Sequence, residues 1–93
     1  MKIEFDQNKS ERNVNERGLP FDLVAEFEWE GAVFSADERF EYPEARFLAL
    51  GFIAGRLYAV MFTGISGGIR VISFRKANPK EVRRYEQEKA AHQ

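Results

Sequence analysis

The segment from residue 46 to residue 76 most constrains the fold, because it reads as three consecutive strands. The first two, 46–53 and 56–63, are rich in Phe, Leu, Val and Tyr, which favour extended backbone. Ala54-Gly55 between them suits a two-residue hairpin turn. A glycine-rich connection then leads to a third strand over 69–76. The segment therefore predicts an antiparallel meander.

Two helices are expected before this meander. Asp6 is a good N-cap residue, a polar helix follows to about Arg17, and Gly18 suits the C′ position. Pro20 opens a second helix. Its apolar residues recur at helical spacing: Phe21, Val24, Ala25 and Phe27.

The last helix has a well-marked start. Asn78 is placed to act as its N-cap, Pro79 occupies the first helical position, and Glu81 follows three residues after the cap. The helix then continues toward the C-terminus with few apolar residues. We expect it to lie on the surface with light anchoring.

The order of elements predicts the fold class. Residues 2–5 alternate as in a short strand, residues 32–34 suit another strand, and residues 36–43 read as an acidic loop. Helices followed by a meander indicate an α+β domain on a mostly antiparallel sheet. We expect two N-terminal helices packed on one face and a C-terminal helix, in a single domain of residues 1–93.

Pairing across the two turns divides the side chains between two faces. It places Arg46 opposite Thr63, and Thr63 opposite Ile69. The face with Arg46 is the more aliphatic and is expected to meet the helices. The other face mixes aromatic residues with Arg70 and Lys76, as a surface that stacks bases and holds phosphates would. A register slip of one residue would exchange the two sets.

Charge divides unevenly along the chain. Residues 1–45 hold five Lys/Arg against twelve Asp/Glu, whereas residues 46–93 hold nine against three. One reading is a face that meets an anionic partner. The other is that the two halves pack together and neutralise each other.

Composition excludes several classes of function. The chain has no cysteine, and its one histidine, His92, is next to the last residue, so thiolate chemistry and histidine catalysis are not expected. No metal or other cofactor is expected. No apolar run approaches the length of a membrane span, and charges at Lys2, Glu4 and Asp6 argue against a signal peptide. We expect a cytoplasmic protein that does not contact the membrane.

The arrangement of residues resembles a known family. The matching positions are Ile3-Glu4-Phe5-Asp6, Lys9, Asn13, Gly18, Phe21, Arg46, Gly51, Gly55-Arg56-Leu57, Thr63, Ile69-Arg70-Val71-Ile72-Ser73, Arg75-Lys76-Ala77, Glu81 and Arg83-Arg84-Tyr85-Glu86. Together they look like a BrnT-type toxin of a type II toxin–antitoxin system. The resemblance implies a RelE-like α+β fold and a ribonuclease. It also implies a ribbon-helix-helix antitoxin partner, and operator DNA that is bound only through that antitoxin.

Two departures from the family pattern leave an alternative open. Members often carry Lys-His-Gly where this chain has Glu16-Arg17-Gly18, and often an arginine after the threonine, where this chain has Gly64-Ile65-Ser66. Both changes remove polar groups that could serve an active site. The alternative is a degenerate, non-enzymatic toxin that acts as a binding module and corepressor with its antitoxin.

Metal-independent RNA cleavage needs a base near the 2′-hydroxyl, cations around the phosphorus and an acid for the leaving oxygen. Arg70 and Arg75 suit the cationic role, because the guanidinium fork matches phosphate oxygens. Their alternative role is an ion pair with the acidic half. Arg46 is a further candidate; Glu44 beside it would act as a base or, more simply, neutralise it.

Weaker candidates complete the predicted site. Lys9 stands in the first turn of the first helix, where a cation opposes the helix dipole, and such violations of local rules gather at functional sites. Tyr85 would stack on a base, donate a proton or simply anchor the last helix. Three further cations, on the third strand of the meander and on the last helix, are expected to bind RNA phosphate: Lys76, Arg83 and Arg84.

Overall fold

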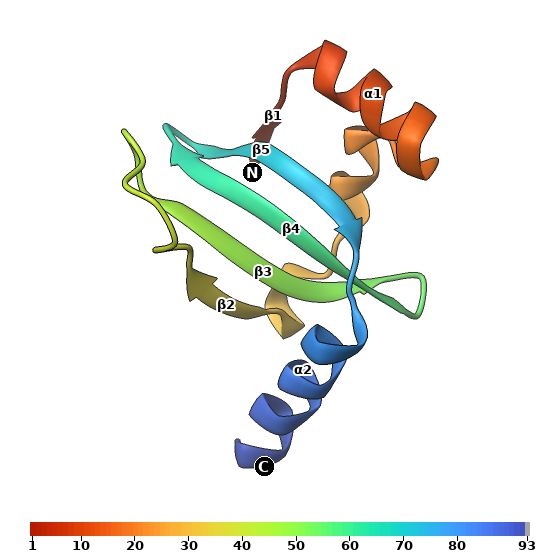
Figure 1. Cartoon of the computed structure of the whole chain (residues 1–93), viewed down its shortest axis with the longest axis vertical. Coiled ribbons are helices and arrows are strands. Elements are labelled where there is room, and N and C mark those ends of the chain that lie inside the picture. Colours follow the sequence, from red (N-terminus) through yellow and green to blue (C-terminus); the bar gives the residue numbers. More distant parts are fainter. Residues whose placement is uncertain (93) are drawn as a thin grey trace.

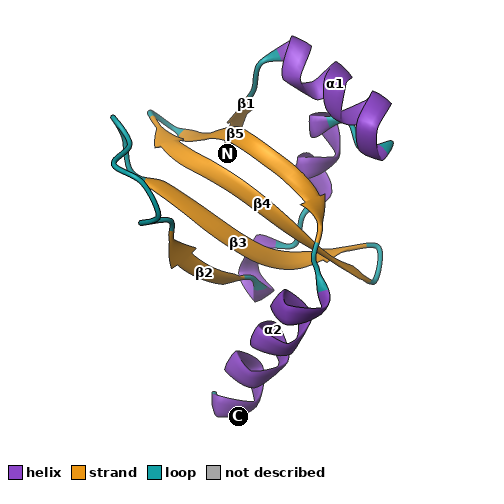
Figure 2. Ribbon diagram, viewed as in Figure 1, coloured by secondary structure: helices purple, strands orange, loops and turns teal. Residues whose placement is uncertain are grey.

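The computed structural model describes residues 1–92 and contains a five-stranded sheet, two α-helices and two 3₁₀-helices (Figures 1 and 2). In chain order these elements are β1 (Lys2–Glu4), α1 (Gln7–Arg17), η1 (Phe21–Glu26), η2 (Trp29–Gly31), β2 (Val33–Ala36), β3 (Arg46–Ile53), β4 (Arg56–Ile65), β5 (Gly68–Lys76) and α2 (Pro79–Ala91). The predicted α+β class and the three-stranded meander are confirmed.

The sheet is mixed, so the prediction of a mostly antiparallel sheet is wrong. Its strand order is β1-β5-β4-β3-β2, and the first pair is parallel. Gly68 allows this pairing, because a Cβ at its position would overlap the backbone of Lys2. A three-residue strand pattern does not indicate the direction of its partner, which is why the sequence did not disclose the parallel pair.

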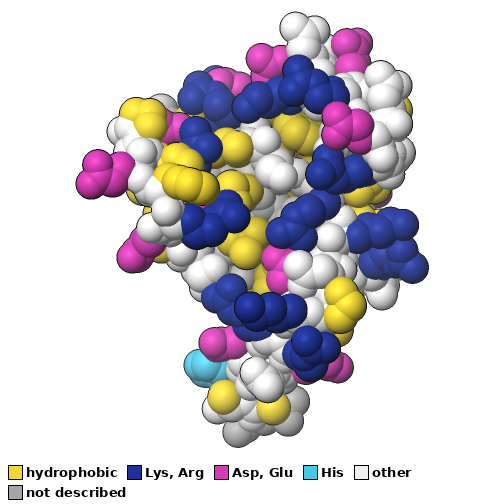
Figure 3. Space-filling model, viewed as in Figure 1, with side chains coloured by type: hydrophobic (Ala, Val, Ile, Leu, Met, Phe, Trp, Pro, Cys, Tyr) yellow, Lys and Arg dark blue, Asp and Glu magenta, His cyan; other side chains and the backbone are white. Residues whose placement is uncertain are grey.

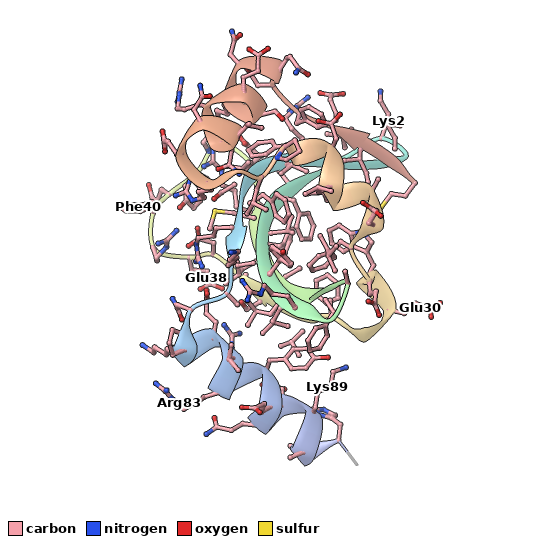
Figure 4. The ribbon with its side chains drawn as sticks, turned by 90° about the vertical axis from the view of Figure 1, so that its right-hand side faces the viewer. Lys2, Glu30, Glu38, Phe40, Arg83 and Lys89 are labelled. Carbon is pink, nitrogen blue, oxygen red and sulfur yellow. The ribbon has the colours of Figure 1, made fainter. Side chains whose placement is uncertain are left out.

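The predicted arrangement of the N-terminal helices is also wrong. α1 has the expected cap, since the Asp6 carboxylate accepts the N–H groups of Asn8 and Lys9 at 2.8 and 3.2 Å. However, its only buried residues are Ser10 and Asn13, so it lies beside the sheet without contributing an apolar face. Figure 4 shows η1 and η2 along one side of the sheet and α2 below its lower end.

The segment expected as the second helix is the 3₁₀-helix η1. Phe21 and Val24 in this helix and Phe27 at its C-cap are 3, 0 and 4 % exposed, and these buried residues recur every third position. That period matches the three residues per turn of a 3₁₀-helix. Pro20 precedes the helix as an extended cap with ψ 144°. The apolar spacing was therefore a 3₁₀ signal rather than an α-helical one.

The main core lies on the face that we expected to bind RNA. The apolar residues of η1 pack there against Ala49, Val60, Phe62 and Phe74, which are all buried. The opposite face, expected to meet the N-terminal helices, is covered only in part. There α2 and its Tyr85 pack on a smaller cluster of Leu50, Leu57 and Ala59. The two faces are thus exchanged relative to the prediction.

A β-bulge in β5 also moves one of the predicted site residues to the other face. The predicted pair of Arg46 and Thr63 is confirmed, but Thr63 faces Arg70 rather than Ile69. Between Met61 and Phe62 the register shifts, so one extra residue, Ile72, enters β5. Because side chains alternate between faces, this shift brings Arg70 to the same face as Arg46.

Candidate functional site

A row of charged side chains crosses the open face of the sheet. Glu4 on β1 is level with Arg70 on β5, which is level with Thr63 on β4 and then with Arg46 on β3. Thr63 is 2 % exposed, and its hydroxyl donates to the Ala45 carbonyl at 2.7 Å. Two guanidinium groups therefore stand on either side of a buried threonine.

Each arginine of this row has a carboxylate neighbour. Arg70 Nε donates to Glu4 Oε1 at 2.9 Å, and Arg46 Nη2 lies 3.5 Å from Glu44 Oε1. The hydrogen bond and charge of Arg70 lower the pKa of Glu4, so this carboxylate stays ionised. Pairing with the acidic half is thus confirmed for both arginines. Exposed ion pairs of this kind contribute little to stability because water screens them, so an incoming phosphate can displace the carboxylates.

The row borders a groove of about 390 Å³, here called the β1-side groove. It is lined by Glu4, Lys9, Glu44, Arg46 and Arg70, together with backbone and side chains around Ile72. Lys9 reaches this groove from the first turn of α1. The structure therefore brings together three of the cations that the sequence nominated.

A second groove of about 250 Å³, the α2-side groove, lies next to α2. Leu48 and Met61 contribute to its lining, together with Arg75, Arg84 and Glu81. The pair between Arg75 and Glu81 is bidentate, at 2.7 and 3.0 Å. This pairing lowers the pKa of Glu81, against the opposing effect of burial, and raises the pKa of Arg75. The partner of Arg75 thus comes from the basic half of the chain rather than from the acidic half.

Basic residues of α1 form another wall of the open face. Lys9, Arg12 and Arg17 line a hollow of about 280 Å³ beside Ile72 and Ser73 of the bulge. The candidates from sequence did not include Arg12 and Arg17. Their helical spacing to Lys9 was the signal that could have found them.

Buried hydrogen bonds of Asn13 hold this wall in place. Its Nδ2 donates to the carbonyls of Leu19 at 2.8 Å and Phe74 at 2.9 Å, and its Oδ1 accepts from Arg17 at 2.8 Å. Asn13 thereby links α1 to β5 and orients a guanidinium group. Arg17 therefore adds a held guanidinium group to this wall.

The cations gather on one face. Figure 3 shows Lys and Arg side chains around the middle of the face that Figure 1 presents, with hydrophobic side chains between them. Arg70 pairs with Thr63 and Arg75 pairs with Ala59, four residues away on β4. At the usual rise per strand residue, these two positions are about 13 Å apart. Several cations at this scale match the repeated charge of a polyanion better than a single small anion.

The other nominated residues lie outside the charged row. The Tyr85 hydroxyl donates to the Gly31 carbonyl at 3.2 Å, and its ring packs edge-on against Phe52, which anchors α2. Lys76 is exposed and lines a further hollow with Arg17 and Arg75. Arg83 projects from α2 into solvent (Figure 4).

Within residues 1–92, no three His, Cys, Asp or Glu side chains lie close enough together to hold a metal ion. Neither described α-helix is long and apolar enough to cross a membrane.

Comparison with known proteins identifies the family. A search of curated proteins found no match. The sequence model of a family described as the ribonuclease toxin, BrnT, of type II toxin–antitoxin systems matches residues 5–81. This match covers α1, η1, η2, the strands β2 to β5 and the beginning of α2, and it begins just after β1. The chain therefore belongs to the BrnT family of ribonuclease toxins.

Proposed function

We propose that the protein is an endoribonuclease that cleaves RNA on the open face of its sheet without a metal ion. The observation that supports this most is the row of Arg46, Thr63 and Arg70, which sets two guanidinium groups on either side of one threonine. In cleavage of this type the 2′-oxygen attacks the adjacent phosphorus, and the 5′-oxygen leaves. Preorganised cations at the phosphorus stabilise the charge that develops.

Each candidate has a distinct role in this proposal. Arg46 and Arg70 bind the non-bridging oxygens of the reacting phosphate, after displacing Glu44 and Glu4. Lys9, an exposed amine at the same groove, stabilises charge on an entering or leaving oxygen. Arg75 is farther along the open face and binds a neighbouring phosphate of the strand.

Further cations extend the proposed RNA path. Arg84 lines the α2-side groove. Lys76 lines the hollow with Arg17 and Arg75, and Arg83 is exposed on α2. Tyr85 has no place in the reaction as we propose it, because its hydroxyl and ring serve the anchoring of α2.

The family also implies an antitoxin. We propose that this partner is a ribbon-helix-helix protein that inhibits the ribonuclease by covering the open face. The pair then represses its own operon, with operator DNA contacted by the antitoxin alone. The cationic face suits an acidic inhibitory segment, because displaced carboxylates of the toxin would be replaced by those of the partner.

The test is cleavage of a defined single-stranded RNA by the purified protein, with and without EDTA. We expect cleavage that resists EDTA and falls by two or more orders of magnitude in Arg70→Ala, as is typical for loss of one preorganised donor. Arg56→Ala is the matched control, because Arg56 is exposed beside the β3–β4 turn and outside the grooves described above.

Two results would contradict the proposal. Cleavage abolished by EDTA and restored by a divalent cation would reject the metal-independent mechanism. Intact RNA under all conditions, with a folded protein, would favour the binding-module alternative, which the Arg17 and Gly64-Ile65-Ser66 departures already suggest.

A further inference from the structure

The loop between β2 and β3 lines a further pocket, which meets the charged row at Arg46. This loop pocket measures about 320 Å³. The side chains that matter to its chemistry are Glu38, Phe40, Tyr42, Glu44 and Arg46. Glu44 and Arg46 line the β1-side groove as well, so the pocket opens beside the proposed phosphate site.

Hydrogen bonds inside the loop preform this pocket. The Asp37 carboxylate, whose side chain is only 4 % exposed, accepts from Arg39 Nε at 2.9 Å and from the Tyr42 hydroxyl at 2.8 Å. The Arg39 hydrogen bond in particular holds the pKa of Asp37 well below its usual range. With its hydroxyl held in this way, the Tyr42 ring lies under Arg46, whose guanidinium carbon is 4.2 Å from the ring centre.

Phe40 presents an aromatic ring to solvent at this pocket. It is 67 % exposed, and within residues 1–92 its one aromatic neighbour is Tyr42, edge-on at 5.9 Å between ring centres. Figure 4 shows Phe40 on the same side of the sheet as Glu38 and Arg83, and away from Glu30. An exposed ring beside a phosphate site can stack on a nucleobase, an interaction that RNA-binding proteins use widely.

The polar groups of the pocket suit a base better than a phosphate. Glu44 and Glu38 would repel a phosphate, whereas a carboxylate accepts hydrogen bonds from base N–H groups. The distance of 3.5 Å between Glu44 and Arg46 is too long for a good hydrogen bond, so the carboxylate retains free acceptor sites. Arg46 Nε is buried and has no hydrogen-bond partner within residues 1–92, which leaves one donor to be satisfied.

We propose that the loop pocket binds a guanine base of the RNA substrate, next to the phosphate held by Arg46 and Arg70. Guanine is the base whose pairing edge carries two adjacent donors, N1–H and the 2-amino group, which match the two oxygens of Glu44. Its O6 then accepts from Arg46, and its ring stacks on Phe40. The inference rests on the proposed ribonuclease function and adds its base preference.

The experiment compares two oligoribonucleotides that contain one guanosine or, at the same position, inosine, which lacks the 2-amino group. We expect the wild-type protein to cleave beside guanosine about 5- to 100-fold better, the discrimination typical of a bidentate base contact. Glu44→Gln should bring this ratio close to one while still cleaving the inosine RNA. Phe40→Leu should raise KM for both RNAs and keep the ratio.

Matched controls separate these effects from general loss of charge or ring. Glu41→Gln removes an exposed loop carboxylate outside the pocket, and Phe34→Leu removes a half-exposed ring on the opposite face. Both should behave as the wild-type protein. All variants should first be shown to be folded by thermal unfolding.

Equal cleavage of the two RNAs by the wild-type protein, or an unchanged ratio in Glu44→Gln, would overturn the inference and leave the ribonuclease intact. If no RNA is cleaved, the proposed function fails instead, and fluorescence anisotropy of the same two RNAs then decides about the pocket. Tighter binding of the guanosine RNA that depends on Glu44 would support it. Equal binding would reject it.

Discussion

Arg46 and Arg70 flank Thr63 in one row across three strands, on the face of the sheet that neither η1 nor η2 covers. Arg46 reaches the row from the strand after the acidic loop, and Arg70 reaches it only because of the bulge at Ile72. Backbone pairing of the strands fixes the positions of the two arginines. In the free protein Glu4 and Glu44 neutralise their charges.

If both arginines hold one phosphate, their contributions should be coupled. We expect Arg46→Ala and Arg70→Ala each to lower kcat/KM by about 10²–10³-fold, and the double variant to lose much less than the product of the two effects. The measurement is a double-mutant cycle on a defined RNA. Strictly multiplicative losses would mean that the two side chains act on separate phosphates.

Asn13 should contribute to stability more than its polar neighbours on α1. In Asn13→Ala the carbonyls of Leu19 and Phe74 lose their donor, and a buried group left without a partner costs about 1–3 kcal/mol. Denaturant unfolding measures this loss. Asn15→Ala is the control, since Asn15 is exposed on the same helix; equal losses in the two variants would show that Asn13 has no special role.

The pair of Arg75 and Glu81 should stabilise α2 in a pH-dependent way. Glu81→Gln keeps a side-chain acceptor for the helix cap but removes the charge, so we expect a loss of up to about 1 kcal/mol near pH 7. Because the folded-state pKa of Glu81 is lowered from 4.5, its contribution is present above 4.5 and disappears as pH falls through the lowered pKa.

The check on this prediction is thermal unfolding of both proteins from pH 7 down to pH 3. The difference between them should shrink below pH 4.5. Glu86→Gln, an exposed change on the same helix, should show no such trend. A difference that persists undiminished in acid would show that packing rather than charge accounts for it.

The β3–β4 turn contains a strained residue that can be improved. Ala54 has φ 47°, a left-handed conformation that costs a residue with a Cβ about 1–2 kcal/mol. Ala54→Gly removes this strain and loses part of the gain to a more flexible unfolded chain, so we expect a net gain of about 0.5–1 kcal/mol.

Denaturant unfolding of Ala54→Gly should be compared with Ala45→Gly, because Ala45 is exposed and has no positive φ. The free energy of unfolding of the Ala45→Gly control should fall by about 0.4–1 kcal/mol. A loss of stability in both variants would contradict the left-handed turn.

Gly68 should be needed for the attachment of β1. A Cβ in Gly68→Ala would overlap the backbone of Lys2, so β1 must move away from β5 and Glu4 with it. We expect faster hydrogen exchange over residues 2–4 and destabilisation of about 1–3 kcal/mol. Gly64→Ala is the control, since a Cβ there meets no other atom within 4 Å.

The parts of the fold that depend on neighbouring residues were predictable. The Asp6 cap, the Ala54-Gly55 turn, the pairing of Arg46 with Thr63 and the capping box of Asn78 with Glu81 are all confirmed. The caps and the turn depend on hydrogen bonds and backbone conformations within a few residues, and the pairing of Arg46 with Thr63 follows from the length of that turn.

The faces of the sheet were not predictable in this way. Strand periodicity defines two sets of side chains but does not say which set is covered, and here η1 buried the more aromatic set. One extra residue in β5 then changed the side on which Arg70 lies relative to Arg46. A bulge leaves no clear trace in a short apolar strand, because either register buries similar residues.

The sequence by itself determined the α+β class, the meander, the helix caps and the candidate cations, because these depend on residue type and short-range spacing. Only the tertiary structure decided which cations meet. The parallel attachment of β1, the bulge at Ile72 and the hydrogen bonds of Asn13 are contacts between segments distant in the chain. Such contacts place Lys9, Arg46 and Arg70 at one groove.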